Sequence, residues 1–248
     1  IFQNSFWLFA VGGALFGIHG AFFQYYRFAA ADTAGKQYRS RAIALVLAGG
    51  IVGAIVGPEL AKVSRDLFEP LIFAGSFLTI VGLCFTTIVI LQFINLPNLS
   101  IAQRQDTGRP LLGIARQPEF IVAVLSAMLG FSSMTMVMTA TPLAVIAHNH
   151  SFSDVAFIIQ WHVLGMFAPS FFTGHLIHRF GTLNIILVGA LLIMSCIAVN
   201  LTGVDLANFW MALLALGVGW NFMFIGGTTL LTTTYRPEER AKAQGAND

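Results

Sequence analysis

Long apolar stretches separated by short polar connectors dominate the sequence. Crossing a bilayer core of about 30 Å takes about 20 apolar residues of helix. Seven stretches reach roughly this length and contain few charged residues. They cover residues 6–26, 42–60, 71–94, 120–146, 155–177, 183–201 and 206–231. The pattern therefore predicts seven membrane-spanning helices.

The composition supports this interpretation. Hydrophobic residues make up 56% of the 248 residues and charged residues 10%, against about 25% charged residues in a typical soluble domain. So few charges do not cover a water-exposed surface, whereas a lipid-facing surface needs none. The sequence predicts an all-α membrane protein whose main partner is the lipid bilayer. The two cysteines lie in apolar stretches, and we expect no cofactor, no metal site and no nucleic-acid partner.

The basic residues alternate between the connectors. Lys and Arg concentrate in cytoplasmic loops of membrane proteins. Eleven of the 13 basic residues follow odd-numbered stretches, and Lys62 and Arg65 follow the second. We expect a multi-pass protein of the bacterial inner (plasma) membrane that starts outside and ends inside. The eleven are Arg27, Lys36, Arg39 and Arg41, then Arg104, Arg109 and Arg116, then Arg179, then Arg236, Arg240 and Lys242.

The longest connector divides the helices into two groups. Residues 96–119 contain Pro97, Gly108, Pro110 and Pro118 and are interpreted as a cytoplasmic linker. Residues 1–95 then hold three helices of one bundle, and residues 120–248 hold four helices of another. A weak repeat with an offset of 200 aligns Gly17 with Gly217 and Phe22 with Phe222. Because the chain begins without Met and ends in a charged stretch, we expect sequence to be missing at both ends.

Glycines gather on one face of the second stretch. Gly49, Gly53 and Gly57 are four residues apart and are followed by Pro58. This spacing lets another helix backbone approach closely, and the proline bends the helix. The segment resembles motif C of the major facilitator superfamily, although Ala44 and Ala61-Lys62 replace its outer glycines.

Two further segments resemble the same family. Gly174, Leu176, Arg179 and Gly181 match motif A, with His178 in place of its aspartate. Residues 235–245, which include Arg240, resemble the loop between helices ten and eleven. On the twelve-helix plan of this family the chain corresponds to helices four to ten. Phe16, His19 and Gly20 stand where motif B would place its arginine, glutamine and glycine, so the membrane arginine linked with proton transfer is absent.

Polar residues inside the apolar stretches are the candidates for substrate contact, since such groups are costly in hydrocarbon unless they face a partner or a wet cavity. Gly17, Gly20, Gln24 and Arg27 share one face of the first stretch, which reads either as a cavity wall or as a close helix contact. The full candidate set is His19, Gln24, Arg27, Gln160, His162 and Asn221. The candidates for gating and helix packing are Gly49, Gly53, Gly57, Pro58, Gly174, Arg179, Gly181 and Arg240.

The family resemblance implies secondary active transport of a small organic solute by alternating access, with H⁺ as one candidate coupling ion and without enzymatic activity. Two alternatives stay open. One is an intramembrane enzyme, for which Ser132 follows a Gly-Phe pair. The other is a seven-helix receptor-like protein, although no lysine lies within a stretch to form a Schiff base. The residues select neither the solute nor the direction of transport, and they leave the oligomeric state open.

Overall fold

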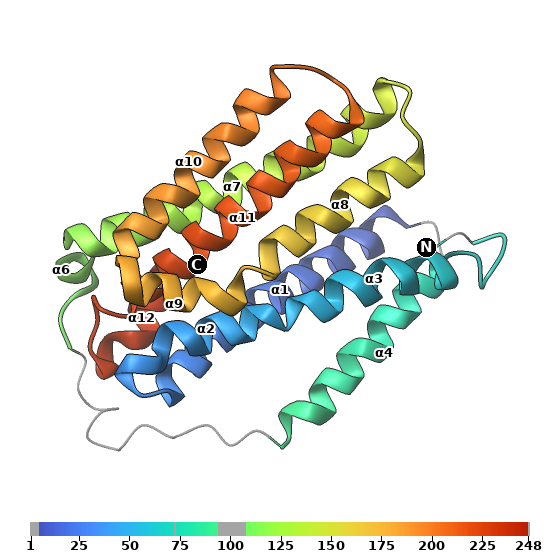
Figure 1. Ribbon diagram of the computed structural model, residues 1–248. Helices are drawn as coiled ribbons and strands as arrows, with labels where there is room; N and C mark the ends of the chain where they lie inside the picture. Colours follow the sequence, from blue (N-terminus) through green and yellow to red (C-terminus); the bar gives the residue numbers. More distant parts are fainter. Residues whose placement is uncertain (1–4, 72, 94–107, 248) are drawn as a thin grey trace. The chain divides into compact units, whose positions relative to one another are not determined.

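The computed structural model describes residues 5–71, 73–93 and 108–247. Every regular element in these ranges is helical (Figure 1). The α-helices are α1 (Phe6–Thr33), α2 (Arg39–Ala48), α3 (Gly50–Arg65), α4 (Ala74–Leu91), α6 (Leu111–Ala115), α7 (Pro118–Ala147), α8 (Phe152–Phe167), α9 (Ser170–Phe180), α10 (Thr182–Asn200), α11 (Leu206–Leu231) and α12 (Arg240–Asn247), with short 3-10 turns at Lys36–Tyr38 and Pro237–Glu239.

The helices agree with the predicted spans. Six of them, within the described residues, are long and apolar enough to cross a membrane, or seven if the bent pair of α8 and α9 is counted as one span. The prediction of an all-α fold is thus confirmed. One of the predicted spans, the fifth, is bent between α8 and α9 at Ala168 and Pro169. The second continues as a single span, Arg39–Ala61, across the boundary of α2 and α3 at Gly49.

Local sequence signals set several helix ends. Ser151 precedes α8, where its hydroxyl accepts a hydrogen bond from the Asp154 N–H at 3.1 Å and the Asp154 carboxylate accepts one from the Ser151 N–H at 2.8 Å. This reciprocal pair is a capping box. Pro118 begins α7, where its missing N–H costs nothing. Gly181 links α9 directly to α10 at φ +86°, a conformation that suits glycine.

The contacts divide the chain into two compact units. The smaller unit contains Ile1–Tyr26 and Val52–Asn98. Within it, α3 and α4 meet at Gly75, where a Cβ atom would lie 2.1 Å from the Ser64 carbonyl oxygen. The Ser64 hydroxyl also donates to the Ser76 hydroxyl at 3.0 Å. The close contact between α3 and α4 therefore depends on a glycine at position 75.

The larger unit contains Arg27–Ile51 and Leu99–Asp248. Its central helix is α11, which packs against α7, α8 and α10 (Figure 1). Glycines permit this packing. A Cβ atom on Gly217 would lie 2.5 Å from the His162 carbonyl oxygen, and one on Gly219 would lie 2.8 Å from the Gly189 carbonyl oxygen. The backbones of α8 and α10 thus approach α11 at positions where no side chain fits.

Residues 27–51 pack onto the same unit. Ala31, Ile43 and Ala44 are buried in one cluster with Ile177 and Ile225, and α2 lies along α9. The larger unit therefore combines residues on both sides of the predicted linker. The predicted boundaries at residues 95 and 119 stay a prediction. They divide the chain into two helix bundles, whereas the two units described above are defined by contacts between residues.

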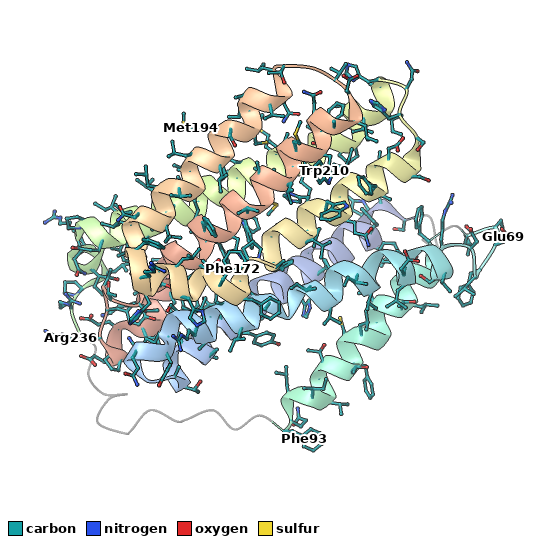
Figure 2. All side chains as sticks on the ribbon, in the orientation of Figure 1. Glu69, Phe93, Phe172, Met194, Trp210 and Arg236 are labelled. Atoms are coloured by element: carbon teal, nitrogen blue, oxygen red, sulfur yellow. The ribbon has the colours of Figure 1, made fainter. Side chains whose placement is uncertain are left out.

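The outer surface of the larger unit is apolar. Met194 on α10 and Phe172 on α9 carry exposed side chains on this surface (Figure 2). Water-soluble proteins rarely expose large continuous apolar patches. A hydrocarbon environment around these helices accounts for the exposure.

Candidate functional site

The bend between α8 and α9 is held by a single side chain of α11. The two helices meet at an angle of 41°, because Pro169 has no N–H to continue the helical hydrogen bonds. The Asn221 amide nitrogen donates to the Met166 carbonyl at 2.6 Å and to the Ser170 hydroxyl at 2.7 Å. Its amide oxygen accepts from the Thr173 hydroxyl at 2.7 Å. Asn221 is fully buried and so ties both halves of the bent span to α11, while substrate contact by Asn221 stays a prediction.

His162 lies about two turns before the bend. Its Nδ1 is 2.8 Å from the Leu213 carbonyl oxygen, so Nδ1 carries the hydrogen and Nε2 holds a lone pair. His162 is fully buried, and its Nε2 has no hydrogen-bond partner among the described residues. Gln160, on the same helix, is half-buried. His162 is thus tied to α11 through one nitrogen and keeps an acceptor on the other.

Arg27 lies against an aromatic stack. Its guanidinium carbon is 4.4 Å from the centroid of the Phe224 ring and 4.5 Å from that of Phe28. Phe224 stacks on Trp220 with 4.6 Å between centroids and 15° between ring planes, and Phe167 meets Trp220 edge-on at 6.1 Å. Arg27 is buried. The predicted candidate Arg27 is therefore part of a cation–π contact between the end of α1 and α11.

The remaining candidates on the first span are less constrained. His19 is an exposed residue of α1 whose ring lies 6.1 Å from that of Phe16. The side chain of Gln24 lies outside the described positions. His19 and Gln24 belong to the smaller unit, whereas Arg27, Gln160, His162 and Asn221 belong to the larger one. Arg27 and His162 contact α11, and Asn221 belongs to that helix. The role of each in substrate binding stays a prediction.

A buried carboxylate organises the segment after α11. Glu239 accepts hydrogen bonds from the Arg109 backbone N–H at 2.8 Å, from Arg109 Nε at 2.7 Å and from Arg109 Nη2 at 2.6 Å. The Arg236 N–H adds a fourth at 3.0 Å. The Arg109 hydrogen bonds hold the pKa of the Glu239 carboxyl well below its ordinary value of 4.5. Arg109 also donates to the Thr234 carbonyl at 3.0 Å, which joins the residues before α7 to those after α11.

A second ion pair reaches α1. Arg240 donates to the Asp32 carboxylate at 2.9 Å. Nearby, Gln244 donates to the Tyr235 hydroxyl at 2.7 Å, and burial raises the pKa of Tyr235 to about 12. Arg240 was predicted as a gating residue. Its partner Asp32 was not predicted, because nothing in the spacing of residues 32 and 240 indicates that they meet.

The glycines predicted to pack helices differ in their surroundings. A Cβ atom on Gly174 would lie 3.2 Å from the Arg41 backbone, so α9 and α2 approach closely there. No described atom lies within 4 Å of a Cβ atom built on Gly53 or Gly57. Gly49 ends α2. The packing role of Gly53 and Gly57 stays a prediction.

The other gating candidates lie at helix ends or outside the described side chains. Arg179 lies in the last turn of α9, where its guanidinium is 5.3 Å from the Phe180 ring centroid, and Gly181 forms the junction described above. Pro58 lies within α3, and its side chain is outside the described positions. Sequence reasoning missed the partners Arg109 and Glu239. The sequence signal for this ion pair was weak, because it consisted only of two adjacent acidic residues in a basic loop.

Comparison with known proteins identifies relatives of this chain. It is 46% identical to the riboflavin transporter RfnT of Brucella anthropi over the whole chain, which spans 63% of that relative. It is 30% identical over 90% of its length to the uncharacterized MFS-type transporter YddS of Bacillus subtilis, and 28% identical over 99% to YdeG of the same organism. The chain spans between 55% and 63% of the length of these relatives.

The names of these relatives describe transporters, in agreement with the expectation that the chain is not an enzyme. The residues that resemble motifs A and C are distributed along the chain, and so is the family match. The sequence model described as Major Facilitator Superfamily matches residues 1–248. The chain therefore belongs to the Major Facilitator Superfamily.

Proposed function

We propose that the protein carries a riboflavin-like solute across the bacterial inner membrane by secondary active transport. The observation that supports this most strongly is the 46% identity, over the whole chain, to a protein named as a riboflavin transporter. The long apolar helices suit a multi-pass membrane protein. The bacterial sources of the relatives support the inner membrane as its location.

Alternating access is the proposed mechanism. Proteins of this kind expose a midplane site first to one side and then to the other by rocking two groups of helices. Two contacts join residues 27–51 to residues 109–248 and would separate in such a motion. One is the Asp32–Arg240 ion pair, and the other is the close approach of Arg41 and Gly174. Both lie near basic residues, on the side that the charge distribution predicts to be cytoplasmic.

An ion gradient is the proposed energy source, with H⁺ as the candidate ion. The motif B arginine is absent, so a proton would use another group. His162 is one candidate, because its Nε2 is a buried acceptor without a hydrogen-bond partner in the described part of the chain. Collapse of the pH gradient with a protonophore is expected to abolish accumulation of the solute. Accumulation that persists would exclude H⁺.

Growth of a riboflavin auxotroph tests the proposed function. The full-length protein is expressed in bacteria that lack both riboflavin synthesis and their own riboflavin uptake. We expect growth at micromolar riboflavin and uptake of labelled riboflavin, with none in cells that carry the empty vector. Purified protein in vesicles should show the same flux. Absence of riboflavin flux in both systems would overturn the proposal, and hydrolysis of a substrate without flux would favour the intramembrane enzyme.

A further inference from the structure

The aromatic stack on α11 has a chemistry that the helix packing does not use. Trp220 and Phe224 lie almost parallel at 4.6 Å, one helical turn apart. Methionines from two other helices, Met134 and Met166, surround them. Aromatic rings and thioethers form soft, polarisable surfaces that bind flat ring systems well.

Trp220 also carries an unused hydrogen-bond donor. Its side chain is 4% exposed, and its Nε1–H has no hydrogen-bond partner among the described residues. A buried indole N–H usually finds a partner, and leaving it without one is unfavourable. A ligand with a flat ring and a flexible polar chain would supply both the stacking partner and the acceptor.

Arg27 lies on one face of the stack. Its planar guanidinium is 4.4 Å from the Phe224 centroid, a distance at which flat groups stack. Arg27 lies at the end of α1, on the segment 27–51, and Leu47 of that segment also contacts the cluster around Trp220. Separation of this segment from α11 would carry both side chains away and uncover the rings.

We infer that Phe224, stacked on Trp220, binds the ring system of the transported flavin on the face that Arg27 covers when no solute is bound. This inference rests on the proposed function. The isoalloxazine ring is flat and electron-poor, so it stacks on the face of Phe224 that Arg27 leaves, while the electron-rich indole supports the other face. The ribityl hydroxyls, which extend beyond the ring, are acceptors for the Trp220 Nε1–H. The ring and the Arg27 guanidinium compete for the same face of Phe224.

Three substitutions in the full-length protein test the site. F224L removes the ring at similar volume and is expected to raise the KM for riboflavin uptake about tenfold or more, by analogy with stacked bases. W220F keeps a ring and deletes the N–H, and we expect a rise of about three- to tenfold. R27M removes the competing cation, and we expect tighter riboflavin binding together with slower transport.

W210F is the matched control. Trp210 lies on the same helix, in a different cluster, edge-on to Trp161 at 5.8 Å. Its Nε1 is also buried without a partner in the described residues, so W210F makes the same chemical change away from the stack. The KM of W210F is expected to equal that of the wild type. If W220F and F224L also equal the wild type, the inference is wrong while the proposed function stands.

A competition experiment on the wild type needs no variant to fold. Lumiflavin carries the ring without the ribityl chain, and ribitol carries the chain without the ring. We expect lumiflavin to inhibit riboflavin uptake and ribitol to have no effect. Inhibition by ribitol alone would overturn the stacking site. If the wild type neither binds nor transports riboflavin, it is the proposed function that fails.

Discussion

Helices α1 and α11 are predicted to be related by a weak repeat, and their surroundings differ. The repeat with an offset of 200 aligns Gly17 with Gly217 and Phe22 with Phe222. In the most apolar window of α11, 72% of the residues are buried, against 0% for α1. A Cβ atom on Gly217 would meet the backbone of α8 at 2.5 Å, whereas no described atom lies within 4 Å of one on Gly17.

The difference shows what small residues along a helix do and do not determine. Glycines make a close approach possible, but they do not bring a neighbour. In α11 the neighbours are α7, α8 and α10, and atoms of each of these helices lie against a glycine of α11. Substitution of the aligned glycine is therefore expected to cost much free energy in α11 and little in the described surroundings of α1.

The sharpest test of this comparison substitutes the aligned glycines in the 248-residue chain. We expect Gly217→Val to destabilise it by about 3 kcal/mol or more, since the added side chain overlaps the His162 carbonyl and the packed helices have nowhere to move. Gly17→Val should stay within about 0.5 kcal/mol of the parent. Thermal unfolding in detergent measures both. Equal losses at the two positions would contradict the comparison.

The next largest effect is expected at Asn221. Asn221→Ala removes three hydrogen bonds and leaves the Met166 carbonyl without that donor. We expect a loss of about 1–3 kcal/mol. Asn184→Ala is the control, because Asn184 is exposed and bonds within its own helix to Phe180. A loss at Asn184 as large as at Asn221 would show that the bend does not depend on the amide.

The carboxylate after α11 is expected to have an intermediate effect. Glu239→Gln weakens the hydrogen bonds with Arg109 and should lower the midpoint of thermal unfolding by roughly 2–5 °C near neutral pH. The folded-state pKa of Glu239 is depressed below 4.5. Its stabilisation is therefore complete above pH 4.5 and is lost as the pH falls further, because the unfolded chain takes up the proton first.

The comparison of wild type and Glu239→Gln checks this sign. The difference between their unfolding midpoints should be constant from pH 6 to 8 and should shrink as the pH falls below 4.5. A difference that grows on acidification would contradict the assigned pKa direction.

The smallest effect is expected at the end of α1. Asp32→Asn breaks the pair with Arg240, whose side chain is 30% exposed. Such partly exposed pairs contribute at most about 1 kcal/mol. Because salt screens exposed pairs, the loss should decrease further at 1 M salt. A larger loss of stability for Asp32→Asn than for Glu239→Gln would contradict the expected order of the two effects.

The sequence allowed the membrane-spanning helices to be predicted, but not which residues pair with one another in the folded chain. Helix α11 begins and ends at the predicted residues, because long apolar stretches and their polar flanks are local signals. Pro169 is visible in the sequence, yet the span was predicted as continuous. A proline inside a membrane helix does not by itself determine whether the helix bends. The Arg109–Glu239 and Asp32–Arg240 pairs join residues 130 and 208 positions apart. Such choices depend on tertiary packing, which no periodicity records.

The elbow between α8 and α9 has a mechanical consequence. A proline bend in a membrane helix often behaves as a joint, but here the amide of Asn221 braces both arms at once. The two arms and α11 are then expected to travel together as one stiff frame. Flexing would then have to occur outside that frame, for example along the surface where α2 lies against α9 at Gly174. If the Asn221 hydrogen bonds were removed, α8 and α9 could flex relative to each other. Less of a helix movement would then be transmitted through them to the rest of the protein.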